Sequence, residues 1–122
     1  MTETKTMPLD GVRVLDFTQV MLGPCATQML ADFGADVIKV ERPGAGDLSR
    51  NFFGEISEAA QNNAVFSSLN RNKRSIEVDT KSAAGKQLIY DMVKVSDVVV
   101  DNFRAGVMDR LGFGHEDLKK IN

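Results

Sequence analysis

Positively charged side chains lie in and beside several predicted loops of this sequence, and they indicate a ligand that carries more than one phosphate group. Guanidinium and ammonium groups bind phosphate oxygens through charge-assisted hydrogen bonds. Loops that lead into helices add free backbone N–H groups and the positive end of the helix dipole. The alternative is a set of solvated surface charges without a common ligand, and the residues alone leave both possibilities open. The cations concerned are Arg42, Arg50, Arg71, Lys73, Arg74, Lys81, Arg104 and Arg110.

NAD is the obvious alternative ligand. Glu41 ends a predicted strand, where an acidic residue of a dinucleotide site would bind a ribose hydroxyl. The preceding loop at residues 18–24 has the sequence TQVMLGP, with one glycine in place of a G-x-G-x-x-G motif. Without those glycines the backbone cannot approach a pyrophosphate in the usual way, so the sequence argues against NAD.

Patterns for nucleophilic or metal chemistry are weak. Cys25 falls in the first turn of a predicted helix, where a thiolate would be stabilised, but the single histidine, His115, lies at the far end of the chain. We expect Cys25 to pack in the interior and His115 to be exposed at the start of a helix. No Cys/His spacing suggests a metal site, and the residues alone predict no catalytic group.

The loops are positioned by a strand–loop–helix–strand unit over residues 12–41. Residues 12–17 (VRVLDF) and 36–41 (DVIKVE) are apolar and β-branched, as is typical of buried strands. Between them the sequence predicts a helix that begins at Gly23 and Pro24 and stops at a left-handed Gly34. Two strands joined by one helix lie parallel with a right-handed crossover, and ligands bind at the carboxyl ends of such strands.

The rest of the chain predicts two more strands, at residues 75–79 and 97–103. A second long helix starts at Thr80 or Ser82, a short one stops at Gly112, and another starts at Glu116. Residues 42–63 form a long connection without clear periodicity, in which Phe52 and Phe53 are expected to dock onto a surface outside this chain. The state of residues 64–69 stays open. Helix periodicity predicts these buried side chains: Ala26, Met29, Leu30 and Phe33 in the first helix, and Leu88, Ile89, Met92 and Val93 in the second.

The order of elements predicts an α/β fold, a Rossmann-like parallel sheet with flanking helices. The 122 residues are enough for one domain, and residues 1–7 are expected to form a flexible arm. A net charge of −2 argues against nucleic-acid binding, and no apolar run is long enough to cross a membrane. One cysteine fits a reducing cytosol, so we expect a cytoplasmic protein.

The sequence resembles the family III CoA-transferases, also called the carnitine–bile-acid or formyl-CoA transferase family, in four blocks that follow in the family's order. They are residues 8–50, residues 70–86 (NRNKRSIEVDTKSAAGK), residues 96–114 (SDVVVDNFRAGVMDRLGFG) and residues 115–122 (HEDLKKIN). The resemblance covers nearly all of the chain from Pro8 onward. It is specific for the family and much less specific for the substrate.

The resemblance implies which residues bind coenzyme A (CoA). By position, Met21 and Leu22 correspond to two residues of formyl-CoA:oxalate relatives that contact CoA, and Arg42 to an arginine at its nucleotide end. The remaining residues implied are Val78, Asp79, Thr80 and Lys81 at the nucleotide, Asn102, Phe103 and Arg104 along the pantetheine and diphosphate, and Arg110 as a further cation. These relatives carry a glutamine where this chain has Met21, while Gln19 stands two residues earlier, which weakens an assignment of oxalate as the substrate.

The family's fold and chemistry imply more than this chain contains. Family subunits are several hundred residues long and form interlaced homodimers. Their catalytic aspartate forms a mixed anhydride and later an enzyme–CoA thioester, and its position lies beyond residue 122. The resemblance therefore implies that residues 8–122 are a truncated, N-terminal CoA-binding α/β domain without a catalytic residue or a metal.

The implied function is transfer of CoA between an acyl-CoA and a small carboxylic acid. An α-methylacyl-CoA racemase of the same family is one alternative, and it would need a general-base histidine downstream. A non-catalytic CoA- or nucleotide-binding module is another, and a chain that naturally ends at Asn122 would favour it. An NAD-dependent oxidoreductase is the weakest alternative.

Overall fold

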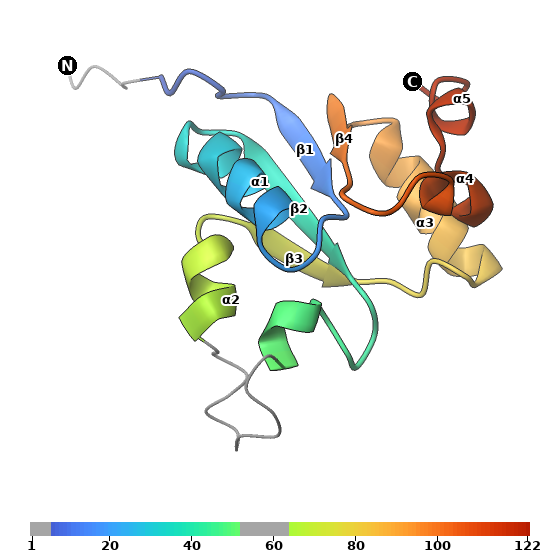
Figure 1. The fold of residues 1–122 in the computed structure, drawn as a ribbon. Helices are drawn as coiled ribbons and strands as arrows, with labels where there is room; N and C mark the ends of the chain where they lie inside the picture. Colours follow the sequence, from blue (N-terminus) through green and yellow to red (C-terminus); the bar gives the residue numbers. More distant parts are fainter. Residues whose placement is uncertain (1–5, 52–63) are drawn as a thin grey trace.

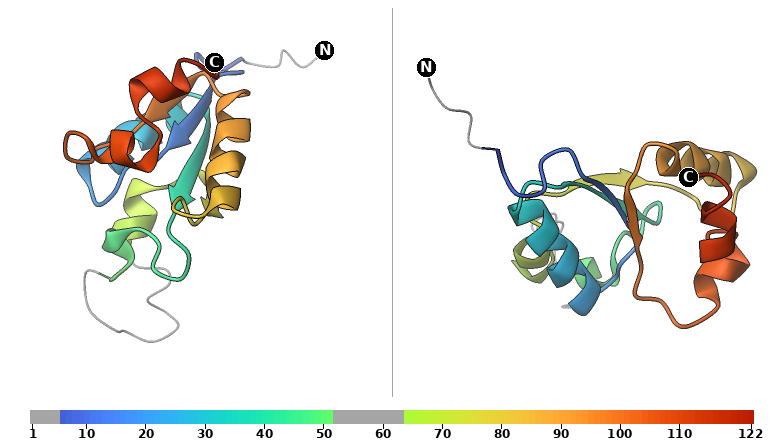
Figure 2. Two further views of the ribbon diagram at one scale, coloured as in Figure 1. Left: turned by 90° about the vertical axis from the view of Figure 1, so that its right-hand side faces the viewer. Right: turned by 90° about the horizontal axis from the view of Figure 1, so that it is seen from above.

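The computed structural model describes residues 6–51 and 64–122. It has one parallel sheet of four strands in the order β3-β2-β1-β4, with helices on both of its faces (Figures 1 and 2), which confirms the predicted fold class. The strands are β1 (Arg13–Asp16), β2 (Asp36–Glu41), β3 (Arg74–Glu77) and β4 (Val98–Val100). The helices are α1 (Leu22–Asp32), the 3-10 helix η1 (Leu48–Asn51), α2 (Ala64–Leu69), α3 (Ala83–Val93), α4 (Val107–Leu111) and α5 (His115–Leu118).

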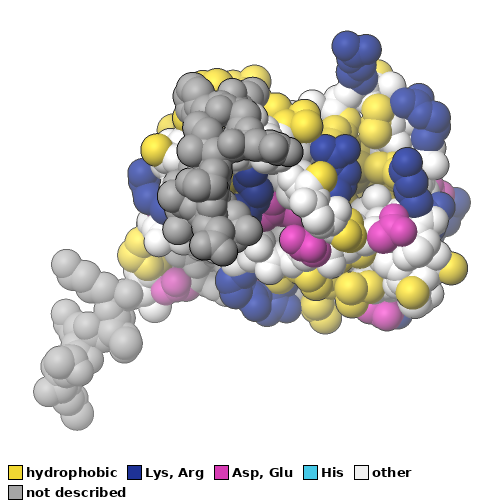
Figure 3. Space-filling view, turned by 90° about the horizontal axis from the view of Figure 1, so that it is seen from below, with side chains coloured by type: hydrophobic (Ala, Val, Ile, Leu, Met, Phe, Trp, Pro, Cys, Tyr) yellow, Lys and Arg dark blue, Asp and Glu magenta, His cyan; other side chains and the backbone are white. Residues whose placement is uncertain are grey.

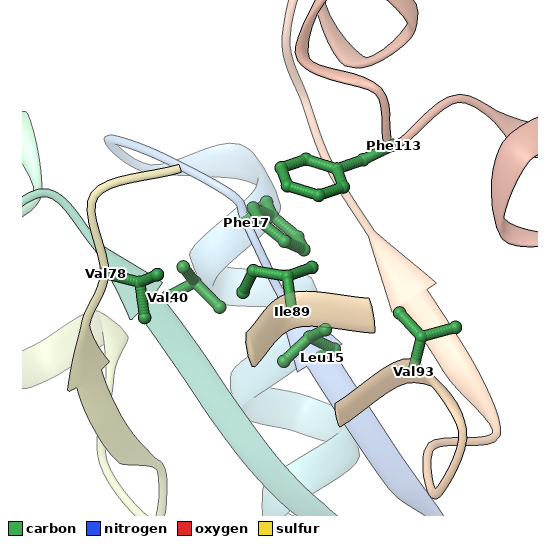
Figure 4. Packing of buried hydrophobic residues seen from close by; sticks show 7 residues of the cluster. All are labelled: Leu15, Phe17, Val40, Val78, Ile89, Val93 and Phe113. Atoms are coloured by element: carbon green, nitrogen blue, oxygen red, sulfur yellow. The ribbon is translucent and has the colours of Figure 1, made fainter. Parts of the chain in front are cut away.

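The main hydrophobic core lies between the sheet and the helices of the C-terminal half (Figure 4). Phe113 belongs to this core, with its ring centroid 5.7 Å from that of Phe17 and 5.6 Å from that of Tyr90. The other buried members are Leu15, Val40, Val78, Ile89 and Val93. Because β1 and β2 alternate their side chains, this core leaves every second residue of these strands for the opposite face of the sheet.

The opposite face, toward α1, is apolar where the strands begin and polar where they end. Val14 and Val37 pack there with Ala31 and Ala35. Two and four residues further along the same strand direction, the buried side chains are Asp16, Thr18, Lys39 and Glu41. Burial of this many polar groups requires that they bond to one another, and the loops around the carboxyl ends supply many of their partners.

The polar half of the sheet explains why the predicted buried face of α1 is wrong. Ala26, Met29 and Phe33 are exposed and Leu30 is half-buried. The buried residues of the helix are Gly23, Pro24, Thr27, Gln28 and Ala31. Thr27 faces the sheet because its Oγ1 donates a 2.7 Å hydrogen bond to Asp16 Oδ2. Because the sheet surface beneath α1 is polar, the polar side of the helix packs against it, although the hydrophobic pattern predicts the apolar side.

Most other elements agree with the sequence within one or two residues. The predicted bounds of β2 are confirmed, Gly34 and Gly112 have positive φ at helix ends, and Ser82 caps α3 by accepting from the Gly85 amide at 3.0 Å. In α3, Ile89 and Val93 are buried as predicted and Met92 is half-buried, whereas Leu88 is exposed.

The remaining sequence expectations need correction, were left open, or lie outside the described residues. α1 begins at Leu22 with Met21 as its N-cap, two residues before the predicted N-cap Gly23 and first helical residue Pro24. β4 is shorter than predicted and pairs, among the described residues, only with β1, so Val98 is exposed at the sheet edge. Residues 64–69, which the sequence left open, form α2. Residues 1–5 of the expected arm and both Phe52 and Phe53 lie outside the described residues.

Candidate functional site

A pocket of about 310 Å³ opens at the carboxyl edge of the sheet, where loops from all four strands meet. Its apolar walls are Phe17, Val40, Leu48, Val78, Phe103 and Leu111. Its polar lining consists of Gln19, Glu41, Arg42, Thr80 and Lys81. An apolar slot with a few polar and charged groups at its border suits a ligand that has both a flat ring system and phosphates.

The cations at this pocket are available for a ligand. Arg42 and Lys81 are exposed, and neither side chain forms an ion pair with another described residue. Figure 3 views the molecule from the side toward which β1, β2 and β3 point, and Lys and Arg side chains lie there among hydrophobic ones. This surface combines positive charge with apolar contact area.

The loop after β1 is braced by residues from two other loops. The Gln19 amide donates to Asn102 Oδ1 at 2.8 Å, and Asn102 Nδ2 donates to the Gln19 carbonyl at 2.9 Å. The Gln19 side chain in turn accepts from the amide of Leu48 at 3.3 Å. Gln19 therefore joins the loops that follow β1, β2 and β4, and it lines the pocket as well.

The loop between β3 and α3 is held against the end of β2. The Val78 amide donates to the Glu41 carbonyl at 2.9 Å, which extends the strand pairing by one residue. Asp79 Oδ1 accepts from the Lys81 amide at 3.0 Å, and the Asp79 carbonyl accepts from the Ser82 hydroxyl at 2.9 Å. These bonds fix the turn that carries Thr80 and Lys81 at the pocket.

Four of the cations that the sequence singled out for phosphate are engaged in ion pairs. Arg71 pairs with Asp32 at 2.6 Å and Arg74 with Asp36 at 2.7 Å. The other two pairs are buried or partly buried: Lys73 with Asp16 at 3.1 Å and Arg50 with Glu41 at 2.7 Å. Arg74 also starts its strand, so it lies at the edge opposite the pocket. The idea of one common ligand for all these cations is therefore not supported by their positions.

The Glu41–Arg50 pair makes Glu41 a structural acid. Burial raises the pKa of Glu41, but hydrogen bonds from Arg50 and from the Asp47 amide outweigh burial and hold that pKa below its usual range. The Arg50 guanidinium donates to both carboxylate oxygens at 2.7 Å and also lies 3.6 Å from the centre of the Phe66 ring. Glu41 thus holds η1 and α2 near the sheet, a role different from binding a ribose.

The pocket contains some of the residues expected to contact CoA and leaves others outside. Those that line it are Arg42, Val78, Thr80, Lys81 and Phe103. Asp79 forms the turn beside the pocket, and Asn102 braces the first loop. Met21 and Leu22 are exposed at the start of α1, and Arg104 and Arg110 are exposed before and within α4. The sequence reasoning missed Phe17, Gln19, Val40, Leu48 and Leu111, although Phe17 ends a predicted strand and Gln19 lies in the loop after it.

The remaining candidates for chemistry have simple environments. Cys25 is half-buried in the first turn of α1, which only partly agrees with interior packing, and His115 is exposed at the start of α5 as predicted. Among the described residues, no three His, Cys, Asp or Glu side chains gather as metal ligands would. None of the described helices is both long enough and apolar enough to pass through a membrane.

Two curated proteins similar to this chain have the same name. The formyl-CoA:oxalate CoA-transferase of Rhodopseudomonas palustris (strain BisA53) is 51% identical over 117 residues, which are 96% of this chain and 27% of that protein. The enzyme of the same name from Afipia carboxidovorans is 52% identical over 114 residues, which are 93% of this chain and 26% of that protein. The chain thus spans about a quarter of the length of these relatives.

Solved structures agree with this likeness. Rv3272 from Mycobacterium tuberculosis, in its orthorhombic form, matches 95% of this chain and 30% of its own with 44% identity and a TM-score of 0.80. A CAIB/BAIF family protein from Brucella suis matches 97% of this chain and 32% of its own with 40% identity and a TM-score of 0.83. The family model described as CoA-transferase family III matches residues 9–122. The chain therefore belongs to CoA-transferase family III.

Proposed function

We propose that this chain is the CoA-binding part of a transferase that moves CoA between an acyl-CoA and a small carboxylic acid. The observation that carries the proposal is the pocket at the carboxyl edge, with apolar walls and, at its border, the cations Arg42 and Lys81, which form no ion pair with a described residue. Family membership and the names of the relatives support the same reaction class. Under this proposal residues 8–122 form one binding unit of a longer protein.

The chemistry of CoA matches the chemistry of the site. The adenine ring would pack against the apolar side chain of Val78, and the phosphates would meet Arg42 and Lys81. Phe103 would line the path of the pantetheine and diphosphate. Thr80 and the Asp79 turn complete the nucleotide end. The pantetheine arm would run past Asn102 and Arg104 toward Met21 and Leu22, with Arg110 as an additional cation.

The transfer itself requires a group that this chain does not supply. We propose a carboxylate nucleophile from a residue beyond Asn122, an aspartate in the family's pattern, which takes the acyl group as a mixed anhydride and later holds CoA as a thioester. Such covalent catalysis divides one difficult exchange into easier steps. The contribution of this chain is binding energy at the nucleotide, remote from the thioester, which can be used to orient the reacting end.

The assembly and the compartment are part of the proposal. We propose a homodimer for the full-length protein and a cytoplasmic location. Its partners under this proposal are the two substrates, without a nucleic acid or a membrane. Analytical ultracentrifugation of the full-length protein would give a mass of two subunits. A stable monomer that is fully active would contradict the dimer.

Calorimetric titration with CoA, with NAD as the control ligand, tests the central proposal. We expect heat from CoA and little from NAD, and we expect Arg42→Ala to weaken CoA binding. Arg74→Ala is a matched control, because it removes a cation at the opposite edge of the sheet. Absence of CoA binding by both the 122-residue chain and the full-length protein would refute the proposed function and reopen the alternative of a non-catalytic module for another ligand.

A further inference from the structure

A fully buried ion pair lies beneath the loop that follows β1. The side chains of Lys39 on β2 and Asp47 before η1 are 1% and 0% exposed, and Lys39 Nζ lies 2.8 Å from Asp47 Oδ2. Neither residue lines the pocket, so neither is placed to touch a ligand there. Buried ion pairs cost so much desolvation that apolar residues of similar volume often stabilise a fold equally well. Stability alone is therefore a poor explanation for this pair.

Each member of the pair also bonds to the loop. Lys39 Nζ donates to the Thr18 carbonyl at 2.7 Å, and Asp47 Oδ1 accepts from the Val20 amide at 3.1 Å. The amide and the hydroxyl of Ser49 donate to the same Asp47 oxygen at 2.8 and 2.7 Å, which fixes the orientation of the carboxylate. The ion pair therefore holds the loop on both sides of Gln19.

Val20 has the backbone conformation that most needs this support. Its φ is +71°, in the left-handed region that β-branched residues rarely adopt. Such conformations persist where surrounding contacts enforce them, and they occur often at functional sites. The next residues are Met21 and Leu22, at the start of α1, so the backbone at Val20 determines where these two side chains lie.

The charge state of the pair suits this arrangement. Burial raises the pKa of Asp47, but the hydrogen bonds from Lys39 and Ser49 outweigh burial, and the pKa lies below its usual range. The ionised carboxylate offers one oxygen to the ammonium group and the other to the loop. A neutral acid would have a proton on one of these oxygens and would lose an acceptor.

We propose that Lys39 and Asp47 are positioning residues that hold residues 18–22 in the shape required for CoA binding, acting through Thr18 and Val20. This inference rests on the proposed CoA-binding function. It assigns to the buried pair a role in ligand affinity that is separable from its role in folding.

The double variant Lys39→Met/Asp47→Val tests the inference in the 122-residue chain, because it removes both buried charges and fills the site with apolar side chains of comparable size. We expect the variant to stay folded with a lower thermal midpoint, because the Thr18 carbonyl, the Val20 amide and Ser49 lose their partners. We expect the Val20 amide to exchange its hydrogen about tenfold faster or more, and the Kd for CoA to rise about tenfold, as for the loss of a charge-assisted bond. Arg74→Met, at the opposite edge of the sheet, should change neither the Val20 exchange rate nor the Kd for CoA.

A folded double variant with unchanged Val20 exchange and unchanged CoA affinity would overturn the positioning role and leave the proposed function intact. If neither the wild-type chain nor the full-length protein binds CoA, the proposed function fails, and Val20 exchange still decides whether the pair shapes the loop. Asp47→Asn provides a second variant should the double variant not fold. It keeps the side-chain volume and should raise both the exchange rate of the Val20 amide and the Kd for CoA.

Discussion

The side-chain amide of Asn102 satisfies both backbone groups of Gln19, a residue 83 positions earlier in the chain. The two hydrogen bonds, 2.8 and 2.9 Å long, tie the loop after β1 to the loop after β4. The oxygen and the nitrogen of the amide are each used once, so a residue with two equal oxygens cannot replace it. This pairing makes Asn102 a brace of the pocket as well as a candidate contact for the ligand.

Asn102→Asp should therefore weaken CoA binding. Aspartate can accept from the Gln19 amide but cannot donate to the Gln19 carbonyl, and its charge repels that oxygen. We expect a loss of about 1–2 kcal/mol in binding free energy, measured by calorimetry. The control is Asn122→Asp, which removes amide bonds to the Val93 and Ser96 carbonyls far from the first loop. Equal losses in both variants would contradict a specific role for Asn102.

Arg42→Ala and Lys81→Ala should each weaken CoA binding by about 1–3 kcal/mol, because each removes a charge-assisted contact to phosphate. The wild-type affinity should fall as salt is added, since exposed charges are screened, and the variants should respond less steeply. Titrations at two salt concentrations measure both effects. Unchanged affinity in both variants would remove these residues from the site.

Gly23→Ala should distort the first loop. A Cβ at this position would lie 2.5 Å from Thr18 Cβ and 2.6 Å from Thr18 Cγ2, closer than packed carbon atoms allow, and 3.0 Å from Asn102 Cγ. We expect a loss of about 1–3 kcal/mol in the free energy of unfolding together with weaker CoA binding. Ala26→Ser on the exposed side of the same helix is the control, and its thermal midpoint should stay near that of the wild type. A thermal midpoint of Gly23→Ala equal to that of the wild type would show that the loop accommodates the extra methyl group without loss of stability.

Acid should destabilise the fold through the buried carboxylates. The pKa values of Glu41 and Asp47 lie below their ordinary values of 4.5 and 3.8, since hydrogen bonds from cations and amides outweigh burial. Groups with a lowered folded-state pKa stabilise the fold above the unfolded-state pKa and lose this contribution as the pH falls through the folded-state pKa. The thermal midpoint should therefore begin to fall as the pH drops below about 4.5.

Glu41→Gln should have a lower midpoint than the wild type at pH 7 but a flatter decline in acid, because its side chain no longer takes up a proton. Thermal denaturation from pH 7 to pH 3 measures both curves. The outcome that contradicts the assignment is an equally steep decline in the variant.

Phe113→Ala should cause the largest loss of stability among these variants. The side chain is 1% exposed and packs against Phe17 and Tyr90. Loss of a buried aromatic ring costs about 3–5 kcal/mol in the free energy of unfolding. Urea titration measures this loss. The control Leu22→Ala, at a position that is 84% exposed, should change the free energy of unfolding little. A small change for Phe113→Ala would mean that the C-terminal helices contribute little to the core.

The sequence predicted the parallel sheet and the carboxyl edge as the site because these depend on local patterns. Strand periodicity, Gly34 and Gly112 each act within a few residues of the element that they define. The cations were harder to interpret, since Arg50 and Lys73 pair with acids from other elements. Sequence spacing gives no information about such distant partners.

The orientation of α1 could not be predicted for the same reason. Its pattern of Met29 and Phe33 indicates a buried apolar face when the helix is considered alone. The polar sheet surface at Asp16 and Lys39 reverses this preference, and it becomes visible only when β1, β2 and α1 are placed together. Gln19 and Leu48 were missed as pocket residues because the loops that carry them meet only in the folded chain.

The exposed apolar side chains of α1 also affect how the isolated chain will behave with fluorescent dyes. Leu22, Met29 and Phe33 leave apolar surface on the outside of the folded helix, with exposed fractions of 84%, 56% and 55%. A dye such as anilinonaphthalene sulfonate becomes fluorescent on apolar surface of this kind. The native chain should therefore fluoresce with the dye before any heating, and a rise above that baseline, rather than the signal itself, is the sign of unfolding.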